Sequence, residues 1–179
     1  MKTNIILITL IILIFVSCDK TTEQKMGSLD GYVYSSLGEP ISGASLSCSG
    51  ENTTSNNNGH YRLNNLTYGN HILSVQKENY YLYERNVDIN SEIENINIEI
   101  EPIITHLHGF IKDYDTNIGI DSAIIVLGEN ETFSNSDGSY NLIIFQGYYN
   151  VEISHEEYHP YSGDIELNTN SFELNYLYN

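Results

Sequence analysis

Two stretches decide the fold: residues 38–48, GEPISGASLSC, and residues 57–63, NNGHYRL. Both return about eighty residues later, as IDSA at 120–123 and DGSYNL at 137–142. What recurs is turn glycines and alternating apolar positions, which determine the path of a backbone, whereas the outward polar residues differ. The chain is therefore predicted to contain two copies of one small β module.

The first copy also resembles a known family. The resemblance lies in Gly-x-Val at 31–33, Gly-x-Pro-Ile-x-Gly-Ala at 38–44, Asn-Gly-x-Tyr-x-Leu at 58–63, Leu-Thr-Tyr-Gly at 66–69, and Tyr80. These motifs are similar to those of the carboxypeptidase regulatory-like domain. The resemblance implies a transthyretin-like Greek-key sandwich of about seven strands, used as an accessory module in surface proteins of the Bacteroidetes type. It implies no peptidase activity, because the module accompanies a separate catalytic domain in carboxypeptidases.

The alternation of apolar and polar residues predicts an all-β chain with two tandem sandwiches. Ile96, Ile98 and Ile100 alternate with polar residues, and no helical stripe follows the N-terminal apolar run. The second copy lacks the Gly-x-Pro turn and the Leu-Thr-Tyr-Gly motif. We expect a signal peptide at 1–17, a flexible tether at 18–28, and carboxypeptidase regulatory-like sandwiches at 29–101 and 104–179. The short apolar link between the sandwiches favours end-to-end packing with limited freedom.

The N-terminal segment has the layout of a secretory signal peptide. An apolar run at 5–16 is too short to span a bilayer as a helix, which needs about 20 residues. It ends in Ser17-Cys18, which resembles a bacterial lipobox, so Cys18 is the expected lipidation site. The alternative is an N-terminal helix with an unrelated cysteine. The lipobox interpretation predicts an outer-membrane lipoprotein that faces the periplasm or the cell surface and contacts the membrane through its lipid.

The net charge restricts which binding partners are expected, and the cysteine content restricts disulfide pairing. The formal net charge of -17 predicts repulsion from phosphate backbones, so we expect no nucleic-acid partner. The second cysteine, Cys48, lies on the inward alternation of its strand. If Cys18 is acylated, Cys48 is left without a disulfide partner and is expected to be a small buried side chain. The alternative is a reactive thiol.

Residues 155–159, HEEYH, match the zinc-peptidase motif HExxH. That motif binds zinc when a helix places both imidazoles on one face. Here Val151 and Ile153 alternate as in a strand, and Pro160 follows at once, so we expect a loop. Metal binding by His155 and His159 is the remote alternative. We expect no catalytic residue, no enzyme activity, no metal and no cofactor.

Three further patterns are weaker. Asp113 and Asp115 have the opening spacing of a calcium loop, but Ile118 stands where an EF-hand has glycine, so a hairpin turn rich in Asp and Asn is preferred. His106 and His108 share one strand face, without a third ligand placed by the sequence. The tripeptide at 121–123, Asp-Ser-Ala, resembles a short O-glycosylation acceptor, and this is a weak hypothesis.

Tyrosines supply the remaining candidate site. Tyr80 and Tyr158 recur between the copies and are expected to pack. The tyrosines interpreted as non-recurring are expected to be exposed and are the candidate ligand contacts: Tyr81, Tyr83, Tyr148 and Tyr161. The sequence thus favours a non-catalytic, lipid-anchored envelope protein for adhesion, scaffolding or ligand presentation, with an outer-membrane protein or a glycan as partner. The alternatives are a carbohydrate-binding component of a surface polysaccharide-uptake system and, remotely, a zinc metallopeptidase.

Overall fold

The structure is a computed structural model that describes residues 23–179. These residues form sixteen β-strands and no helix, which confirms the predicted all-β fold. The predicted signal peptide and the predicted lipidation site, Cys18, lie outside the described residues. Between residues 23 and 179 there is no helix long and apolar enough to cross a bilayer.

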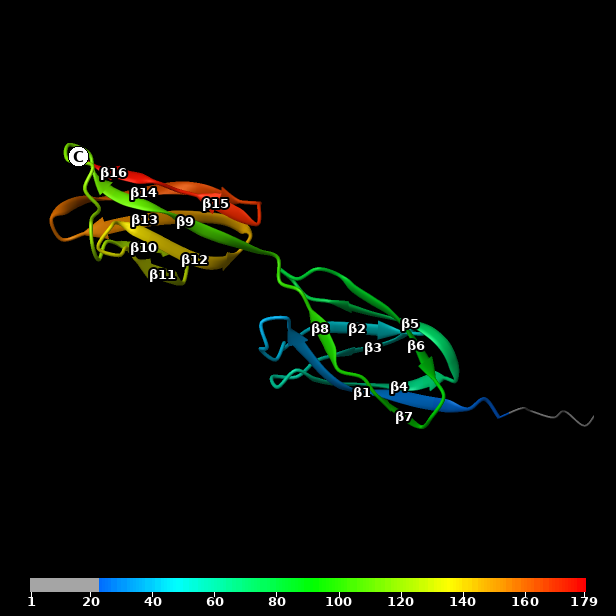
Figure 1. Cartoon of the computed structure of the whole chain (residues 1–179). Coiled ribbons are helices and arrows are strands. Elements are labelled where there is room, and N and C mark those ends of the chain that lie inside the picture. The colour runs from blue at the N-terminus through cyan, green and yellow to red at the C-terminus, as the bar shows by residue number, and fades with distance from the viewer. Residues whose placement is uncertain (1–22) are drawn as a thin grey trace, which may run out of the picture.

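The first sandwich consists of two sheets whose apolar faces meet (Figure 1). Its strands are β1 (Met26–Ser35), β2 (Ser45–Cys48), β3 (Glu51–Thr54), β4 (His60–Thr67), β5 (Gly69–Gln76), β6 (Tyr83–Ile89), β7 (Ile93–Asn95) and β8 (Ile98–Ile100). One sheet has the order β3-β2-β5-β6, and the other has the order β4-β1-β7 with β8 also paired to β1. Both β7 and β8 run parallel to β1, whereas the other pairs are antiparallel.

The second sandwich repeats this topology. Its strands are β9 (Ile104–Asp113), β10 (Ile124–Leu127), β11 (Asn130–Phe133), β12 (Ser139–Phe145), β13 (Gly147–His155), β14 (Tyr158–Leu167), β15 (Ser171–Glu173) and β16 (Tyr176–Tyr178). The sheets have the orders β11-β10-β13-β14 and β12-β9-β15, with β16 also paired to β9. The prediction of two tandem sandwiches is confirmed.

The last strand of each sandwich is interrupted once, so each sandwich has seven strand positions but eight strands. The break in the first sandwich includes Ile96, which the sequence placed inside a continuous strand. The carbonyl of Ile96 accepts a hydrogen bond of 2.8 Å from the Tyr61 hydroxyl, and the carbonyl of Leu174 accepts one of 2.6 Å from Tyr140. A buried tyrosine therefore satisfies the carbonyl at each break.

A glycine on the neighbouring strand makes room for each break. A Cβ built on Gly31 would lie 2.0 Å from the carbonyl oxygen of Ile96, and one on Gly109 would lie 1.9 Å from that of Leu174. The recurring glycines of the two copies are thus required by close backbone approach.

Strand β1 begins inside the range predicted as a flexible tether. Met26 pairs with Thr67 and Gly27 pairs with Leu66, so the last three residues of that range belong to the sheet. The low hydropathy of this segment suggested disorder, but its backbone groups are paired with β4. The backbone pairing, which side-chain composition does not reveal, explains the difference.

In each sandwich a buried serine, Ser55 or Ser134, makes two hydrogen bonds to the backbone of the turn before the second strand. We call this arrangement the serine clasp. The Ser55 hydroxyl donates to the Ile41 carbonyl at 2.7 Å and accepts from the Ala44 amide at 2.9 Å. Ser134 makes the equivalent two bonds, at 2.7 and 2.9 Å, to Ile120 and Ala123. Both serines are buried. These clasps hold the turn that precedes β2 and β10, which is where the repeated Gly-Ala and Ser-Ala motifs lie.

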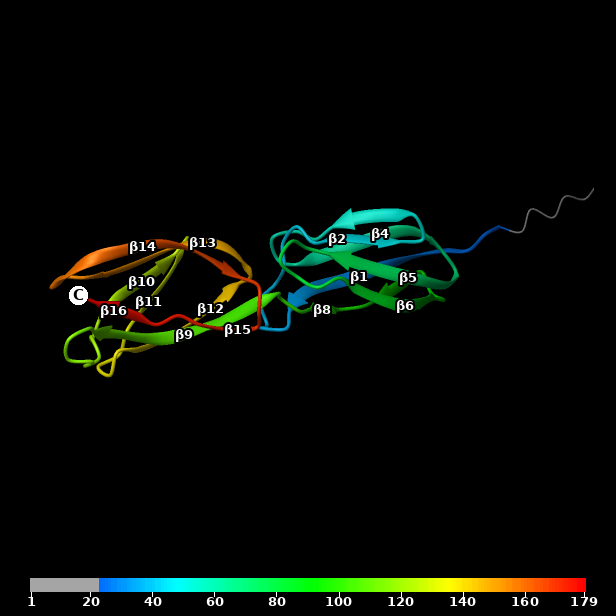
Figure 2. The ribbon, with the colours of Figure 1, turned by 90° about the horizontal axis from the view of Figure 1, so that it is seen from above.

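The two sandwiches lie end to end, as both Figure 1 and Figure 2 show. Strand β1 begins at the end of the first sandwich that is far from the second, and the C-terminus lies at the far end of the second sandwich. Each sandwich has its own core, because the buried apolar residues form two separate clusters. The described part of the chain is therefore a short rod with its ends at opposite poles.

Backbone hydrogen bonds hold the link between the sandwiches. The Tyr81 amide donates to the Glu101 carbonyl at 2.9 Å, and the Ile103 amide donates to the Asn79 carbonyl at 2.8 Å. On the other side, the Gln146 amide donates to the Ile103 carbonyl at 2.9 Å. The link is thus paired with a loop of each sandwich.

Side chains add to this junction. The ring of Tyr80, from the β5–β6 loop, lies 5.7 Å from the ring of Phe145 at the end of β12, measured between ring centroids. Pro102 is buried beside Tyr80, with which it forms an isolated antiparallel bridge. The aromatic contact joins the two sandwiches directly.

Candidate functional site

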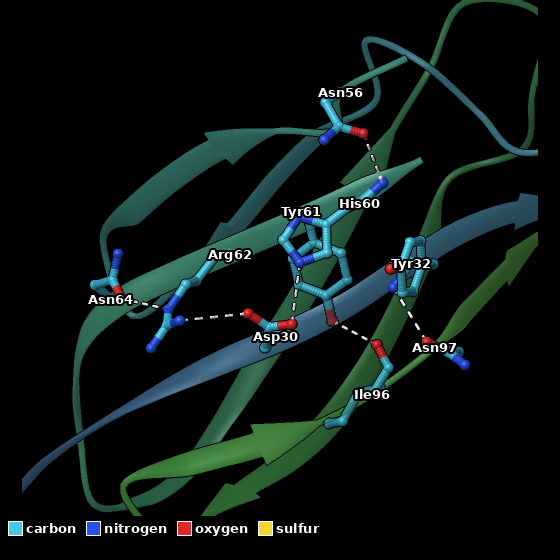
Figure 3. Close-up of polar contacts among 9 residues, drawn as sticks. All are labelled: Asp30, Tyr32, Asn56, His60, Tyr61, Arg62, Asn64, Ile96 and Asn97. Carbon is cyan, nitrogen blue, oxygen red and sulfur yellow. Dashed lines mark hydrogen bonds and ion pairs between the residues drawn. The ribbon is translucent and has the colours of Figure 1, made fainter. Parts of the chain in front are cut away.

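The outer face of the first sandwich carries a polar cluster on β1 and β4 (Figure 3). The register of these strands places Asp30 opposite Arg62. One carboxylate oxygen of Asp30 lies 3.1 Å from Nε2 of His60, and the other lies 3.7 Å from Nη1 of Arg62. The Asn56 side chain accepts a hydrogen bond from the His60 amide at 3.1 Å, and Asn64 accepts one from Nε of Arg62, also at 3.1 Å.

This cluster has no counterpart in the second sandwich. Asp30 corresponds there to His108, and Arg62 corresponds to Asn141. The buried Tyr61 behind the cluster does recur, as Tyr140. The charged groups are partly exposed to solvent, so the pairing is worth about 0–1 kcal/mol. We interpret the cluster as a cross-strand surface pairing. Sequence reasoning missed it, although the alternation of β1 and β4 could have placed its members on one face.

The HEEYH segment forms a hairpin turn. Strand β13 ends at His155 and strand β14 begins at Tyr158, so the two imidazoles lie on different strands. The Glu157 amide donates to Nδ1 of His155 at 3.2 Å, which engages that ring nitrogen in the turn. The helical geometry on which HExxH depends is therefore missing here, as the flanking alternation predicted.

Among residues 23–179, no three histidine, cysteine, aspartate or glutamate side chains converge closely enough to hold a metal ion. Asp113 instead caps its own turn, because its carboxylate accepts hydrogen bonds from the Thr116 amide and hydroxyl at 2.8 and 2.7 Å. These bonds lower the pKa of Asp113. The segment thus forms a turn rich in Asp and Asn, as preferred over a calcium loop. His106 and His108 both lie exposed on one face of β9, as their spacing predicted.

Cys48 is buried in the first core, as its place in the strand alternation predicted. Burial raises the pKa of its thiol, which disfavours the reactive thiolate. In the second sandwich, Asp121 and Ser122 lie exposed in the turn before β10. The hydroxyl of Ser122 is thus accessible to a modifying enzyme.

The four candidate tyrosines do not form one site. Tyr81 is 52% exposed in the β5–β6 loop, and Tyr148 is 81% exposed on β13. The prediction that all four are exposed was wrong for Tyr83 and Tyr161, which are half-buried and pack against the two cores. Tyr161 also contacts the ring of Tyr176, with 4.6 Å between centroids. At the offset that pairs Tyr80 with Tyr158, Tyr83 corresponds to Tyr161, so these two tyrosines do recur and pack in the same way in both sandwiches.

Recurring tyrosines behave as predicted. Tyr80 packs against the first core and Tyr158 against the second. Tyr158 also donates a hydrogen bond of 3.0 Å to the Asp113 carboxylate, which raises the pKa of the tyrosine. Hydrogen bonding to Glu166 raises the pKa of the exposed Tyr148.

Three surface hollows surround the β5–β6 loop. A hollow of 530 Å³ is lined by residues 76–78 with Gly43, Tyr80 and Leu82. A second of 240 Å³ and a third of 270 Å³ share Tyr81 and Glu101. The β5–β6 loop, which is hydrogen-bonded to the link between the sandwiches, is thus bordered by three hollows.

A match to a family model decides the identity of the first sandwich. The model of the carboxypeptidase regulatory-like domain matches residues 28–101. The first sandwich is a carboxypeptidase regulatory-like domain. The match ends one residue after β8, and the second sandwich shares the topology of this domain outside the matched range. No curated protein sequence matches the chain.

Two solved structures of bacterial proteins are similar to this chain. The Bacillus anthracis TIE protein is 17% identical with a TM-score of 0.51, over 85% of this chain and 33% of that protein. A streptococcal ancillary pilin is 11% identical with a TM-score of 0.40, over 86% of this chain and 62% of the pilin. The chain thus spans about a third of the TIE protein. At this identity the similarity shows a shared fold alone.

Proposed function

We propose that this chain is a non-catalytic, lipid-anchored protein of the cell envelope, in which two carboxypeptidase regulatory-like sandwiches form a stiff stalk. The stalk serves adhesion, scaffolding or ligand presentation. The proposal combines the N-terminal lipobox of the sequence, with Cys18 as the lipidated residue, and the rod-like arrangement of the two sandwiches. The same features support a location at the outer membrane.

The paired link between the sandwiches is the observation that carries this proposal. A flexible linker leaves its backbone groups in water, whereas Ile103 donates to one sandwich and accepts from the other. The Tyr80–Phe145 contact adds apolar area to the same junction. Bending at this link breaks these contacts, so the two sandwiches are expected to move as one body.

The position of the chain ends supports a stalk. The predicted lipid attachment lies on the N-terminal side of β1, and β1 begins at one pole of the rod. The other pole is formed by the second sandwich. A protein anchored at Cys18 therefore holds its second sandwich away from the bilayer.

Small-angle X-ray scattering of the mature chain tests the stiffness of the stalk. The variant Cys18→Ser keeps the protein in solution, and its scattering is expected to fit one extended conformation. A control with a Gly-Ser insertion after Pro102 is expected to broaden the distribution of interatomic distances. Scattering that requires an ensemble of pivoting sandwiches in the uninserted protein contradicts the proposal.

Metabolic labelling tests the anchor. Labelled palmitate is expected to be incorporated into the protein and to be lost in Cys18→Ser, because the acyl acceptor is removed. Protease treatment of intact cells then distinguishes the two faces of the outer membrane. Equal labelling of protein and variant contradicts lipidation at Cys18.

A further inference from the structure

Tyr81 is held in an exposed position by the junction. Its backbone amide donates to the Glu101 carbonyl, so the residue is anchored through the main chain while 52% of its surface stays in water. Large aromatic side chains lose little conformational entropy on binding when their backbone is already fixed. Tyr81 therefore presents a preorganised aromatic surface.

Two hollows lie beside Tyr81, because both have Tyr81 and Glu101 in their lining. The 240 Å³ hollow is otherwise lined by residues of the link and of the second sandwich: Pro102, Ile104, His106 and Asn170. The 270 Å³ hollow is otherwise lined by residues of the first sandwich: Leu82, Tyr83, Glu99 and Ile100. We call this pair of hollows the junction groove. Because both sandwiches contribute to it, the groove exists only in the tandem arrangement.

The repeat shows that the fold does not require the side chain of Tyr81. Since Tyr80 corresponds to Tyr158, Tyr81 corresponds to His159 and Leu82 corresponds to Pro160. The packed tyrosine recurs and the exposed one does not. An aromatic ring that packing does not require is a candidate for contact with a ligand.

The chemistry of the lining restricts the ligand. The junction groove has two carboxylates, those of Glu99 and Glu101, and neither lysine nor arginine lines it. An anionic ligand would be repelled by these groups and by the formal net charge of -17. A neutral sugar fits better, because its apolar face packs on a tyrosine ring while its hydroxyls donate to carboxylates and to the amide oxygen of Asn170.

We propose that the junction groove binds a neutral glycan chain, with a sugar ring stacked on Tyr81 and hydroxyl groups donating to Glu99 and Glu101. Two hollows that share Tyr81 and Glu101 in their lining suit an extended oligosaccharide. This proposal rests on the stiff junction proposed above and gives the stalk a ligand class. The ligand binds where the two sandwiches meet.

Calorimetric titration of the mature Cys18→Ser chain tests the proposal. The probes are neutral hexasaccharides of β-1,4-glucan, β-1,3-glucan, α-1,6-mannan and β-1,4-xylan, with hexagalacturonate and hexalysine as charged comparisons. At least one neutral probe is expected to bind, and the affinity is expected to be unchanged between about 50 and about 500 mM NaCl, because no charge pair forms.

Variants locate the site. Tyr81→Ala is expected to weaken binding by at least roughly tenfold, and Tyr81→Phe is expected to keep most of the affinity, because the stacking face remains. Asn170→Ala tests the contribution of the second sandwich and is expected to weaken binding. Tyr114→Ala is the matched control, since this tyrosine is 63% exposed and lies outside the groove, so its loss is expected to leave the affinity unchanged.

Three outcomes overturn the proposal: no neutral probe binds, binding survives Tyr81→Ala, or only hexalysine binds and does so in a salt-dependent way. The last outcome identifies a basic peptide as the ligand instead. Scattering of the same samples separates the two proposals. A rigid rod without glycan binding refutes the groove alone, whereas pivoting sandwiches refute the stalk.

Discussion

Three buried tyrosine hydroxyls have different environments. Those of Tyr61 and Tyr140 donate to the carbonyls at the strand breaks, whereas the hydroxyl of Tyr178 is buried with no hydrogen-bond partner. Tyr178 takes the place of Ile100 of the first sandwich, since both are the last residue of the closing strand. An unpaired buried hydroxyl costs free energy because it has lost its water.

Removal of the unpaired hydroxyl is therefore expected to stabilise the protein. Tyr178→Phe should raise the free energy of unfolding by about 1 kcal/mol, and Tyr140→Phe should lower it by about 1 kcal/mol, because the Leu174 carbonyl loses its donor. Urea titration followed by circular dichroism measures both changes. A loss of stability in Tyr178→Phe would show that its hydroxyl has a partner in solution.

The glycines at the strand breaks give a second prediction for single residues. Gly109→Ala should lower the free energy of unfolding by about 3 kcal/mol, because the added Cβ meets the Leu174 carbonyl oxygen at 1.9 Å. Gly147→Ala is the control, since the nearest atom to its added Cβ is 3.5 Å away, in the Tyr149 ring. Thermal unfolding measures both. Equal melting temperatures for the two variants contradict the steric argument.

At the scale of elements, the serine clasp connects a loop to the end of a strand. Ser134 directly follows β11, and its hydroxyl bonds to two backbone groups in the turn before β10. The hydroxyl adds two hydrogen bonds to a turn that backbone bonds between Ser122, Ala123 and Ser134 also hold. The repeat of the clasp in Ser55 explains why the same turn motif occurs in both copies.

Loss of the clasp should be costly. Ser134→Ala is expected to lower the free energy of unfolding by about 1–3 kcal/mol, because the Ile120 carbonyl and the Ala123 amide lose their partner. Ser162→Ala, at an exposed position on β14, is the control and is expected to change stability by less than about 0.5 kcal/mol. Chemical denaturation compares the two, and hydrogen exchange of the Ala123 amide should accelerate in Ser134→Ala alone. Unchanged exchange would rule out the clasp.

At the scale of the whole molecule, both sandwiches contain buried tyrosines whose ionisation at alkaline pH destabilises the fold. Burial raises the pKa of Tyr61 and Tyr140 well above 10, and that of Tyr178 to about 12. In the unfolded chain these groups ionise near their ordinary pKa of about 10. The folded state holds these protons more tightly than the unfolded state does. The resulting stabilisation is therefore fully present below about pH 10 and is lost as the pH rises toward the folded pKa values.

Both sandwiches are therefore expected to lose stability between about pH 10 and about pH 12. Melting temperatures measured at intervals across this range test the expectation, and ultraviolet absorbance of tyrosinate reports the ionisation. Tyr61→Phe with Tyr140→Phe is expected to flatten the decline, although it lowers stability at neutral pH. A decline of equal steepness in that double variant would assign the effect to other groups.

Much of the fold could be predicted because it depends on local patterns. Turn glycines and period-2 alternation are readable along one strand, and the same alternation argued against a helix at His155 and His159. The strand break at Ile96 escaped prediction because the residues that accommodate it, Gly31 and Tyr61, are distant in sequence. The exposure of Tyr83 and Tyr161 was also misjudged, because they were treated as non-recurring although they occupy corresponding positions of the two copies.

The sequence by itself determined an all-β chain with two copies of one sandwich, a buried Cys48 and packed tyrosines at 80 and 158. It did so because side-chain alternation and turn chemistry are local and appear twice. Only the tertiary structure decided which side chains from different strands meet. The Asp30–His60–Arg62 cluster and the groove around Tyr81 depend on strand register and on the pairing of the link, and these arise from contacts between residues far apart in the chain.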